Sequence, residues 1–206
     1  ETKIIDLPLF GIKDDVFKTF EDRPNLLTKR EIRIQILADL ELSKKGVIWD
    51  ICAGCGSIGL EALKISPNLK LLCIDKRIGS RNLIIKNARN LGVYPEEIIE
   101  DDIKNLLKLK LKKSIERPNR IIIGGANKKT KIQIINQLSA IMKKGNIVVI
   151  PIIEIEALRE LKEVLIDNNF HIELNLIQTY RSLSISEGTR FEPNNPVFIL
   201  KGKKFG

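Results

Sequence analysis

Residues Val47 to Leu63, VIWDICAGCGSIGLEAL, decide the fold of this chain. The stretch begins as a continuous apolar run, which is typical of a strand buried on both faces of a sheet. It breaks at a turn of small residues, Cys52 to Ser57, and then continues in a spacing that favours a helix. A buried strand that passes through a glycine-containing turn into a helix predicts an α/β fold with a ligand site at that turn.

Two cysteines in the turn, Cys52 and Cys55, also have the C-x-x-C spacing of metal and redox sites. A structural zinc site needs four Cys or His ligands, and the one histidine of the chain, His171, lies far along the sequence. A redox pair needs a lowered thiol pKa, which conflicts with a nucleoside-binding turn. We therefore interpret these cysteines, and Cys73 in the neighbouring strand, as small buried residues, and we expect no metal.

Strands and helices alternate along the rest of the chain. Strands are expected at 46–52, 69–75, 96–102, 119–126 and 146–152, and helices from Thr28 onward and at 57–65, 79–92, 129–145 and 154–167. The last two strands, 170–180 and 195–204, have only an irregular loop between them, so they should pair antiparallel at one edge. The pattern predicts an α/β, doubly wound, mostly parallel seven-stranded sheet with an antiparallel terminal hairpin.

Length and charge narrow the class of protein. The 206 residues fit a single domain, 1–206, and a net charge of +9 favours anionic partners without saying which anion. No apolar run approaches the ~18 residues that a membrane span needs. The beginning of the chain also lacks the pattern of a secretory leader. We therefore expect a cytoplasmic protein with no membrane contact.

Acidic residues follow two further predicted strands at the edge where the glycine turn lies. Asp75 ends the second strand, where a carboxylate can accept hydrogen bonds from both ribose hydroxyls, and Asp102 follows the third strand. The turn lacks the Lys of a Walker phosphate loop. We expect a nucleoside in this crevice, and neither a triphosphate nor a dinucleotide pyrophosphate.

The spacing D-x-x-x-G-x-G at Asp50, Gly54 and Gly56 resembles motif I of the class I S-adenosylmethionine-dependent methyltransferases. Further stretches resemble one family among them, the decarboxylating precorrin-6Y or cobalt-precorrin C-15 methyltransferases of cobalamin biosynthesis. These are GIKDDVF (11–17), LLTKREIR (26–33), IIIGGANK (121–128) and EGTRFEPNNPVFIL (187–200). The chain departs from that family at Cys52, where Gly is usual, and after the Gly-Gly pair, where Ala126, Asn127 and Lys128 replace a Gly-rich continuation.

The resemblance implies an activity and a set of site residues. The activity is methyl transfer from S-adenosylmethionine to C-15 of an anionic precorrin or cobalt-precorrin, with loss of the C-12 acetate carboxyl as carbon dioxide. The implied cofactor site is Thr28, Cys52, Ala53, Gly54, Cys55, Gly56, Asp75, Asp102, Ile103 and Gly124, with residues 1–27 as an extension near the substrate. Gly125, Asn127, Arg181 and Arg190 are candidate substrate contacts, and no catalytic side chain is assigned.

Thr28 also has an interpretation from spacing alone. With Glu31 three residues later, Thr28 is expected to be the N-cap of a capping box.

Partners follow from the same resemblance, namely a homo-oligomer such as a tetramer and a C-5 methyltransferase that could act with this chain.

Two alternatives stay open. The positive charge also suits an RNA methyltransferase of the tRNA or rRNA class, although the chain lacks the Asn/Asp-Pro-Pro-aromatic segment after the fourth strand that holds an exocyclic amine. NNPVF (194–198) comes only at the last strand. A methyltransferase-like scaffold without catalysis is the second alternative, suggested by Cys52. Retention of Asp75 and Asp102 argues against a scaffold.

Overall fold

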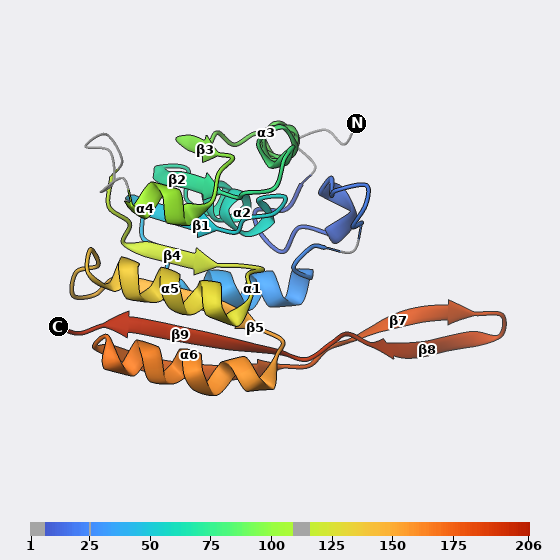
Figure 1. The fold of residues 1–206 in the computed structure, drawn as a ribbon. Coiled ribbons are helices and arrows are strands. Elements are labelled where there is room, and N and C mark those ends of the chain that lie inside the picture. Colours follow the sequence, from blue (N-terminus) through green and yellow to red (C-terminus); the bar gives the residue numbers. More distant parts are fainter. Residues whose placement is uncertain (1–6, 25, 109–115) are drawn as a thin grey trace.

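The computed structural model describes residues 7–24, 26–108 and 116–206. Its centre is a seven-stranded sheet in the order β3-β2-β1-β4-β5-β9-β6 (Figure 1). These strands are β1 (Gly46–Ile51), β2 (Leu69–Ile74), β3 (Glu97–Ile99), β4 (Arg120–Ile123), β5 (Ile147–Ile152), β6 (Phe170–Ile177) and β9 (Val197–Lys204). β1 to β5 are parallel, whereas β9 pairs antiparallel with both β5 and β6. The predicted fold class is confirmed.

Helices cover both faces of the sheet. α1 (Arg30–Asp39), α2 (Ser57–Ile65) and α3 (Ser80–Leu91) share one apolar cluster, and α4 (Ile103–Lys108), α5 (Lys128–Ser139) and α6 (Ile155–Asp167) share the other. Successive strand residues point to opposite faces, so Ile48 enters the first cluster and Trp49 the second. Burial on both faces explains the continuous apolar strands of the sequence.

The segment between the last two sheet strands is a second antiparallel element, not the irregular loop that we expected. β7 (Tyr180–Ile185) pairs with β8 (Gly188–Pro193) through a two-residue turn, and the hairpin extends away from the main sheet (Figure 1). Nearly every residue of both strands is exposed. Apolar and polar residues alternate only over Ser182 to Ile185 of β7, and β8 has one large apolar residue, Phe191, so the sequence pattern indicates a strand only weakly.

Several expected helix boundaries are wrong. α1 begins at Arg30 with Lys29 as its N-cap and has no side-chain cap, so Thr28 lies outside the helix and no capping box forms. α5 ends at Ser139, not at Gly145, because the chain turns over the next six residues. The short helix α4 was not expected at all.

None of the helices in the described part of the chain is long and apolar enough to cross a membrane.

Candidate active site

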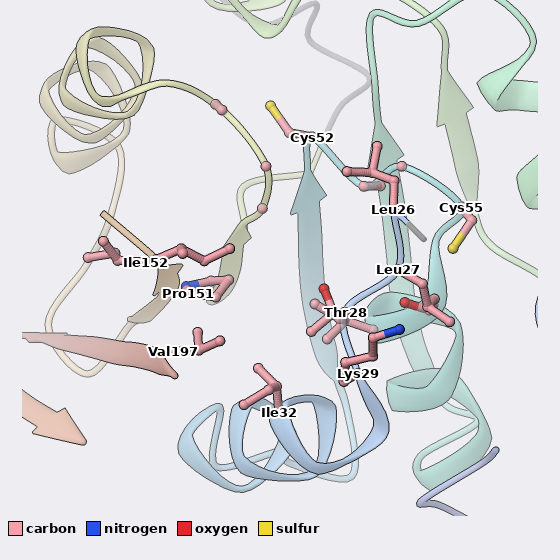
Figure 2. A pocket seen from close by; sticks show the side chains of 18 of the residues that line it. Leu26, Leu27, Thr28, Lys29, Ile32, Cys52, Cys55, Pro151, Ile152 and Val197 are labelled. Atoms are coloured by element: carbon pink, nitrogen blue, oxygen red, sulfur yellow. The ribbon is translucent and has the colours of Figure 1, made fainter. Parts of the chain in front are cut away.

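A cavity of about 580 Å³ lies where β1, β4 and β5 end (Figure 2). Its walls come from the N-terminal segment (residues 7–24 and 26–29), the glycine turn, the loop after β4, the end of β5 and the start of β9. In the lining are Thr28, Cys52 to Cys55, Asp75, Gly124, Gly125 and Asn127. Most residues that the sequence assigned to a ligand site therefore come together at one edge of the sheet.

The glycine turn is held in place by the end of β2. The backbone N–H of Ala53 donates to the carbonyl of Ile74, and that of Gly54 donates to Asp75 Oδ2 at 2.7 Å. Gly54 and Gly56 have φ values of +60° and +78°, a region that glycine enters without a steric cost. Gly56 is the N-cap of α2 and, unlike Gly54, lies behind the cavity wall.

Cys52 also has a left-handed backbone, with φ of +57°. A side chain at such an angle costs roughly 1–2 kcal/mol relative to glycine. The cost explains why glycine would suit this position, where the sequence departs from the family that it resembles. The Cys52 side chain lines the cavity, on the opposite side of the turn from Cys55 (Figure 2).

Burial makes the thiols unreactive. Burial, together with the neighbouring Asp75 carboxylate, raises the pKa of the Cys52 thiol to about 11. Burial also raises the pKa of Cys55 and of Cys73. Redox cysteines instead have a lowered pKa. Within residues 7–24, 26–108 and 116–206, no group of three or more His, Cys, Asp or Glu side chains could hold a metal ion.

Asp50 ties β1 to the start of α2. Its Oδ2 accepts from the backbone N–H of Gly59 at 3.0 Å, and burial raises its pKa to about 7. A Cβ at Gly59 would lie 2.9 Å from the same oxygen, so glycine permits this contact. Gly54, Gly56 and Gly59 have the G-x-G-x-x-G spacing of dinucleotide-binding turns, so the glycine pattern does not support the expectation that a dinucleotide is excluded. That spacing alone does not separate the two cofactor classes.

A second cavity of about 360 Å³ joins the first at Cys52, Asp75 and Gly125. Asp102 and Ile103, at the start of α4, line only this smaller cavity. Asp75 stands between the two, and its oxygens accept from Gly54 and from the backbone N–H of Arg77 at 2.9 Å. Each carboxylate oxygen has two acceptor sites, so Asp75 can still accept from a ligand.

The loop after β4 packs tightly against the glycine turn. A Cβ at Gly124 would lie 2.6 Å from the Cys52 carbonyl oxygen, whereas one at Gly125 would meet nothing within 4 Å. Asn127 caps α5, because its side chain accepts from the Thr130 N–H at 2.9 Å. Asn127 therefore has a structural role as well as a place on both cavity walls.

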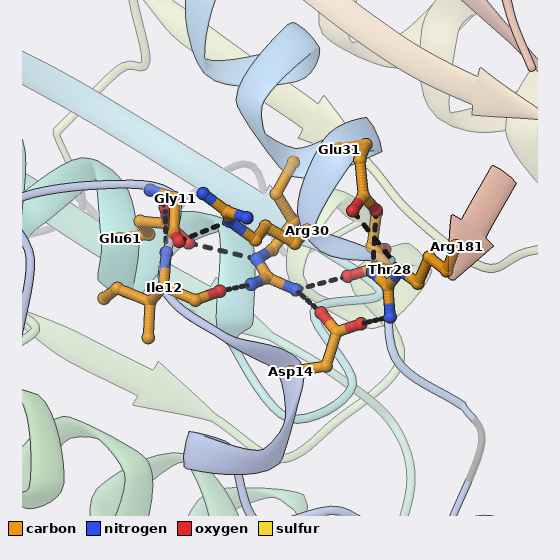
Figure 3. Close-up of polar contacts among 9 residues, drawn as sticks. Gly11, Ile12, Asp14, Thr28, Arg30, Glu31, Glu61 and Arg181 are labelled. Carbon is orange, nitrogen blue, oxygen red and sulfur yellow. Dashed lines mark hydrogen bonds and ion pairs between the residues drawn. The ribbon is translucent and has the colours of Figure 1, made fainter. Parts of the chain in front are cut away.

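Arg181 is held by acidic partners of the fold. Its guanidinium donates to Asp14 at 2.8 Å and to Glu31 at 2.6 Å (Figure 3). Burial would raise the pKa of Asp14, but the bonds from Arg33 and Arg181 hold it below the usual value. Arg190 is exposed on β8, and neither Arg181 nor Arg190 lines either cavity among the described residues. Contact of these two arginines with a substrate stays a prediction.

Sequence reasoning missed several residues of the cavity. Asn194 and Asn195 line it from the segment between β8 and β9, although their stretch was set aside because it comes only at the last strand. Lys131 lines it from the first turn of α5, where a lysine in a polar stretch gave no signal of burial. Asn87 lies behind the turn, where its side-chain amide donates to the carbonyls of Lys18 and Cys55 at 2.9 Å.

Comparisons with known proteins agree with this geometry. The family model described as "Precorrin methyltransferase domain" matches residues 18–204. A protein of Saccharolobus solfataricus, named "Probable cobalt-precorrin-6B C(15)-methyltransferase (decarboxylating)", is 32% identical over 196 residues, which is 94% of this chain and 96% of that protein.

Solved structures are similar over the same span. The crystal structure of precorrin-6y C5,15-methyltransferase from Geobacter metallireducens has a TM-score of 0.85 and 26% identity, over 97% of this chain and 100% of that chain. Precorrin 8w decarboxylase from Methanobacterium thermoautotrophicum has a TM-score of 0.81 and 22% identity, over 93% and 98% of the two chains, and shares the fold.

Proposed function

This chain belongs to the precorrin methyltransferase family, and we propose that it transfers a methyl group from S-adenosylmethionine to C-15 of a precorrin or cobalt-precorrin. In the same reaction, the C-12 acetate side chain loses its carboxyl as carbon dioxide, in cobalamin biosynthesis. The observation that carries the proposal is the pair of joined cavities at the carboxyl ends of the strands, with Asp75 between them. The pair offers separate space for a nucleoside and for a larger second molecule.

The residues present fit the nucleoside of S-adenosylmethionine. We assign the adenine to the smaller cavity, beside Asp102 and Ile103, and the ribose hydroxyls to Asp75. The methionine part then lies on the turn from Cys52 to Gly56, near Thr28 and Gly124. Gly54 supports this assignment because a Cβ there would face open space, so backbone and ligand can approach closely.

The residues of the chain position the reactants and exclude water. When bound, S-adenosylmethionine supplies a methyl group that is already activated. The cavity beside the turn has apolar walls from Leu26, Leu27 and Ile32 on one side and from Ile152 and Val197 on another (Figure 2). These walls keep the acceptor carbon in a dry, fixed position, where positioning alone supplies much of the rate.

The net charge of +9 supports an anionic tetrapyrrole as the second ligand. We further propose a homo-oligomer, such as a tetramer, and association with a C-5 methyltransferase. Exposed apolar side chains on β6 to β8, namely Leu174, Leu176, Tyr180, Leu183, Ile185 and Phe191, support self-association. Light scattering of the purified protein, alone and mixed with that enzyme, measures both.

Calorimetric titration with S-adenosylhomocysteine tests the cofactor assignment. We expect Asp75→Asn to weaken binding about tenfold or more, because an amide replaces one of the two acceptor oxygens. Asp167→Asn is the matched control, because Asp167 is exposed at the end of α6 and lines neither cavity. Equal affinity of the two variants for S-adenosylhomocysteine would contradict the ribose assignment. If the wild type does not bind S-adenosylhomocysteine, the alternative of a non-catalytic scaffold is favoured.

A substrate comparison tests the reaction. The wild type is incubated with S-adenosylmethionine and one of three substrates, namely a precorrin preparation, its cobalt complex or transfer RNA. The masses of the products are measured by mass spectrometry. We expect a tetrapyrrole that has gained one methyl group and lost one carbon dioxide. Methylation of RNA with no tetrapyrrole product would overturn the proposal.

A further inference from the structure

Five cationic residues line the larger cavity, and one of them differs from the rest. They are Arg23, Lys29, Arg77, Lys128 and Lys131. Lys131 is the buried one, with 7% of its surface exposed, whereas the other four are half-buried or exposed. Lys128 already pairs with Glu160, and Arg77 lies over the ring of Phe20 at 4.6 Å. Lys131 therefore brings a positive charge into a place where charge is costly.

The Lys131 ammonium has more donors than the protein satisfies. Its Nζ donates to the carbonyl of Pro151 at 2.9 Å, and an ammonium has three N–H donors. Among the described residues, no carboxylate is close enough to form an ion pair with it. Burial lowers the pKa of Lys131, an effect that Cys52 and Glu154 only partly oppose. A bound anion would complete the hydrogen bonding of this group and favour its charged form.

The position of Lys131 points to the second ligand and not to the nucleoside. Lys131 lines the larger cavity and is not part of the smaller one, where Asp102 lies. Pro151, to which it donates, stands across the cavity from Thr28 (Figure 2). Thr28, at one end of the proposed methionine position, is therefore across the cavity from Pro151, whereas Cys52 is close enough to interact with the ammonium charge.

We propose that Lys131 is a buried anchor for one carboxylate of the tetrapyrrole substrate. The inference rests on the proposed function, because it needs a ligand that carries carboxylates. The anchor lies between the loop after β4 and the end of β5. It therefore determines which carboxylate side chain of the macrocycle lies in the cavity. The role resembles the one that the sequence had offered to Arg181 and Arg190, neither of which lines this cavity.

Lysine variants separate binding of the substrate from binding of the cofactor. Lys131→Met removes the charge at similar length, and Lys131→Gln also keeps an N–H donor for Pro151. Lys131→Arg keeps the charge. Lys129→Met is the matched control, because Lys129 is exposed on the same helix and lines neither cavity. The KM and kcat for the precorrin or cobalt-precorrin, the Kd for S-adenosylhomocysteine and the melting temperature are measured for each.

The expected result is a rise of about tenfold or more in the tetrapyrrole KM for Lys131→Met and Lys131→Gln, since a charge-assisted hydrogen bond is lost. The Kd for S-adenosylhomocysteine stays within about twofold of the wild type. Lys131→Arg recovers most of the KM, and Lys129→Met behaves as the wild type.

Other outcomes overturn the inference in distinguishable ways. An unchanged KM in a folded Lys131→Met protein overturns the anchor and leaves the proposed function intact. A Kd for S-adenosylhomocysteine that rises as much as the KM assigns Lys131 to the cofactor. A wild type that binds S-adenosylhomocysteine but no tetrapyrrole overturns the proposed function and the anchor together.

Discussion

Arg33 on α1 and Glu61 on α2 form an ion pair that is closed to water. Arg33 Nε and Glu61 Oε2 are 3.0 Å apart, and neither side chain has any exposed surface. The same carboxylate accepts from the backbone N–H groups of Gly11 and Ile12, and the same guanidinium donates to the carbonyl of Thr28 (Figure 3). The pair therefore anchors both ends of the N-terminal segment, which forms one wall of the cavity.

Removal of this pair should strongly destabilise the protein. Arg33→Met leaves the Glu61 carboxylate buried without its cation, which typically costs about 3–5 kcal/mol. Urea denaturation measures the free energy of unfolding. Arg159→Met, which breaks an exposed pair on α6, is the control and should change nothing measurable. A loss below about 1 kcal/mol in Arg33→Met would show that the pair does not hold the segment.

Gly124 and Gly125 should respond differently to the same substitution. A Cβ at Gly124 would press against the Cys52 carbonyl, so Gly124→Ala should cost about 1–3 kcal/mol of stability and weaken S-adenosylhomocysteine binding. Gly125→Ala meets open space and should have little effect on stability. Thermal unfolding and calorimetry compare the two. Equal effects of the two substitutions would mean that the turn and the loop are not in tight contact.

Cys52 and Cys55 form a second matched pair. Cys52 has a φ of +57°, so Cys52→Gly should relieve backbone strain. The stability gained from this relief should about equal or exceed the stability lost through the extra entropy of glycine in the unfolded chain. Cys55 does not have a positive φ, and its side chain is buried, so Cys55→Gly should cost about 1–2 kcal/mol of stability. Denaturation curves measure the free energy of unfolding of both variants. A Cys52→Gly protein that is less stable than Cys55→Gly would refute the strain argument.

The raised pKa of Asp50 predicts how the stability of the protein changes with pH. Its pKa rises from 3.8 to about 7 on folding, chiefly through burial, so the folded protein keeps a proton that the unfolded chain loses. The contribution of Asp50 to the free energy of unfolding should therefore fall between about pH 4 and pH 7, by a few kcal/mol, and then level off. Asp50→Asn keeps an acceptor for the Gly59 N–H and lacks this proton, so its advantage over the wild type should grow with pH across that range. Parallel stability curves for the two proteins, measured from pH 4 to pH 8, would contradict the shift.

The sheet could be predicted from the sequence because the burial of a strand determines its pattern of apolar residues. Continuous apolar runs such as Gly46 to Ile51 belong to strands covered on both faces, and the alternation with helices fixed the parallel order. The glycine turn and Asp75 were also predictable, since their place at the ends of adjacent strands follows from topology alone.

Other features depend on contacts that spacing does not show. Arg181 meets Asp14 and Glu31 across more than 140 residues of chain, so its ion pairs had no local signal. Thr28 had the right spacing for a capping box, yet its carbonyl bonds to Arg33 and the helix begins later. Lys131 has the sequence context of a solvated lysine, whereas in the fold it is buried and its Nζ donates to the Pro151 carbonyl near the end of β5. Residues 1–6 and residue 25 of the predicted extension lie outside the described residues.

The most direct test of the central claim counts two labels in one reaction. The protein is supplied with methyl-labelled S-adenosylmethionine and a precorrin or cobalt-precorrin labelled in the C-12 acetate carboxyl. We predict that each methyl group found on the tetrapyrrole is matched by one labelled carbon dioxide released. Methyl transfer with the carboxyl label retained, or no transfer from a preparation that binds S-adenosylhomocysteine, would contradict a decarboxylating C-15 methyltransferase.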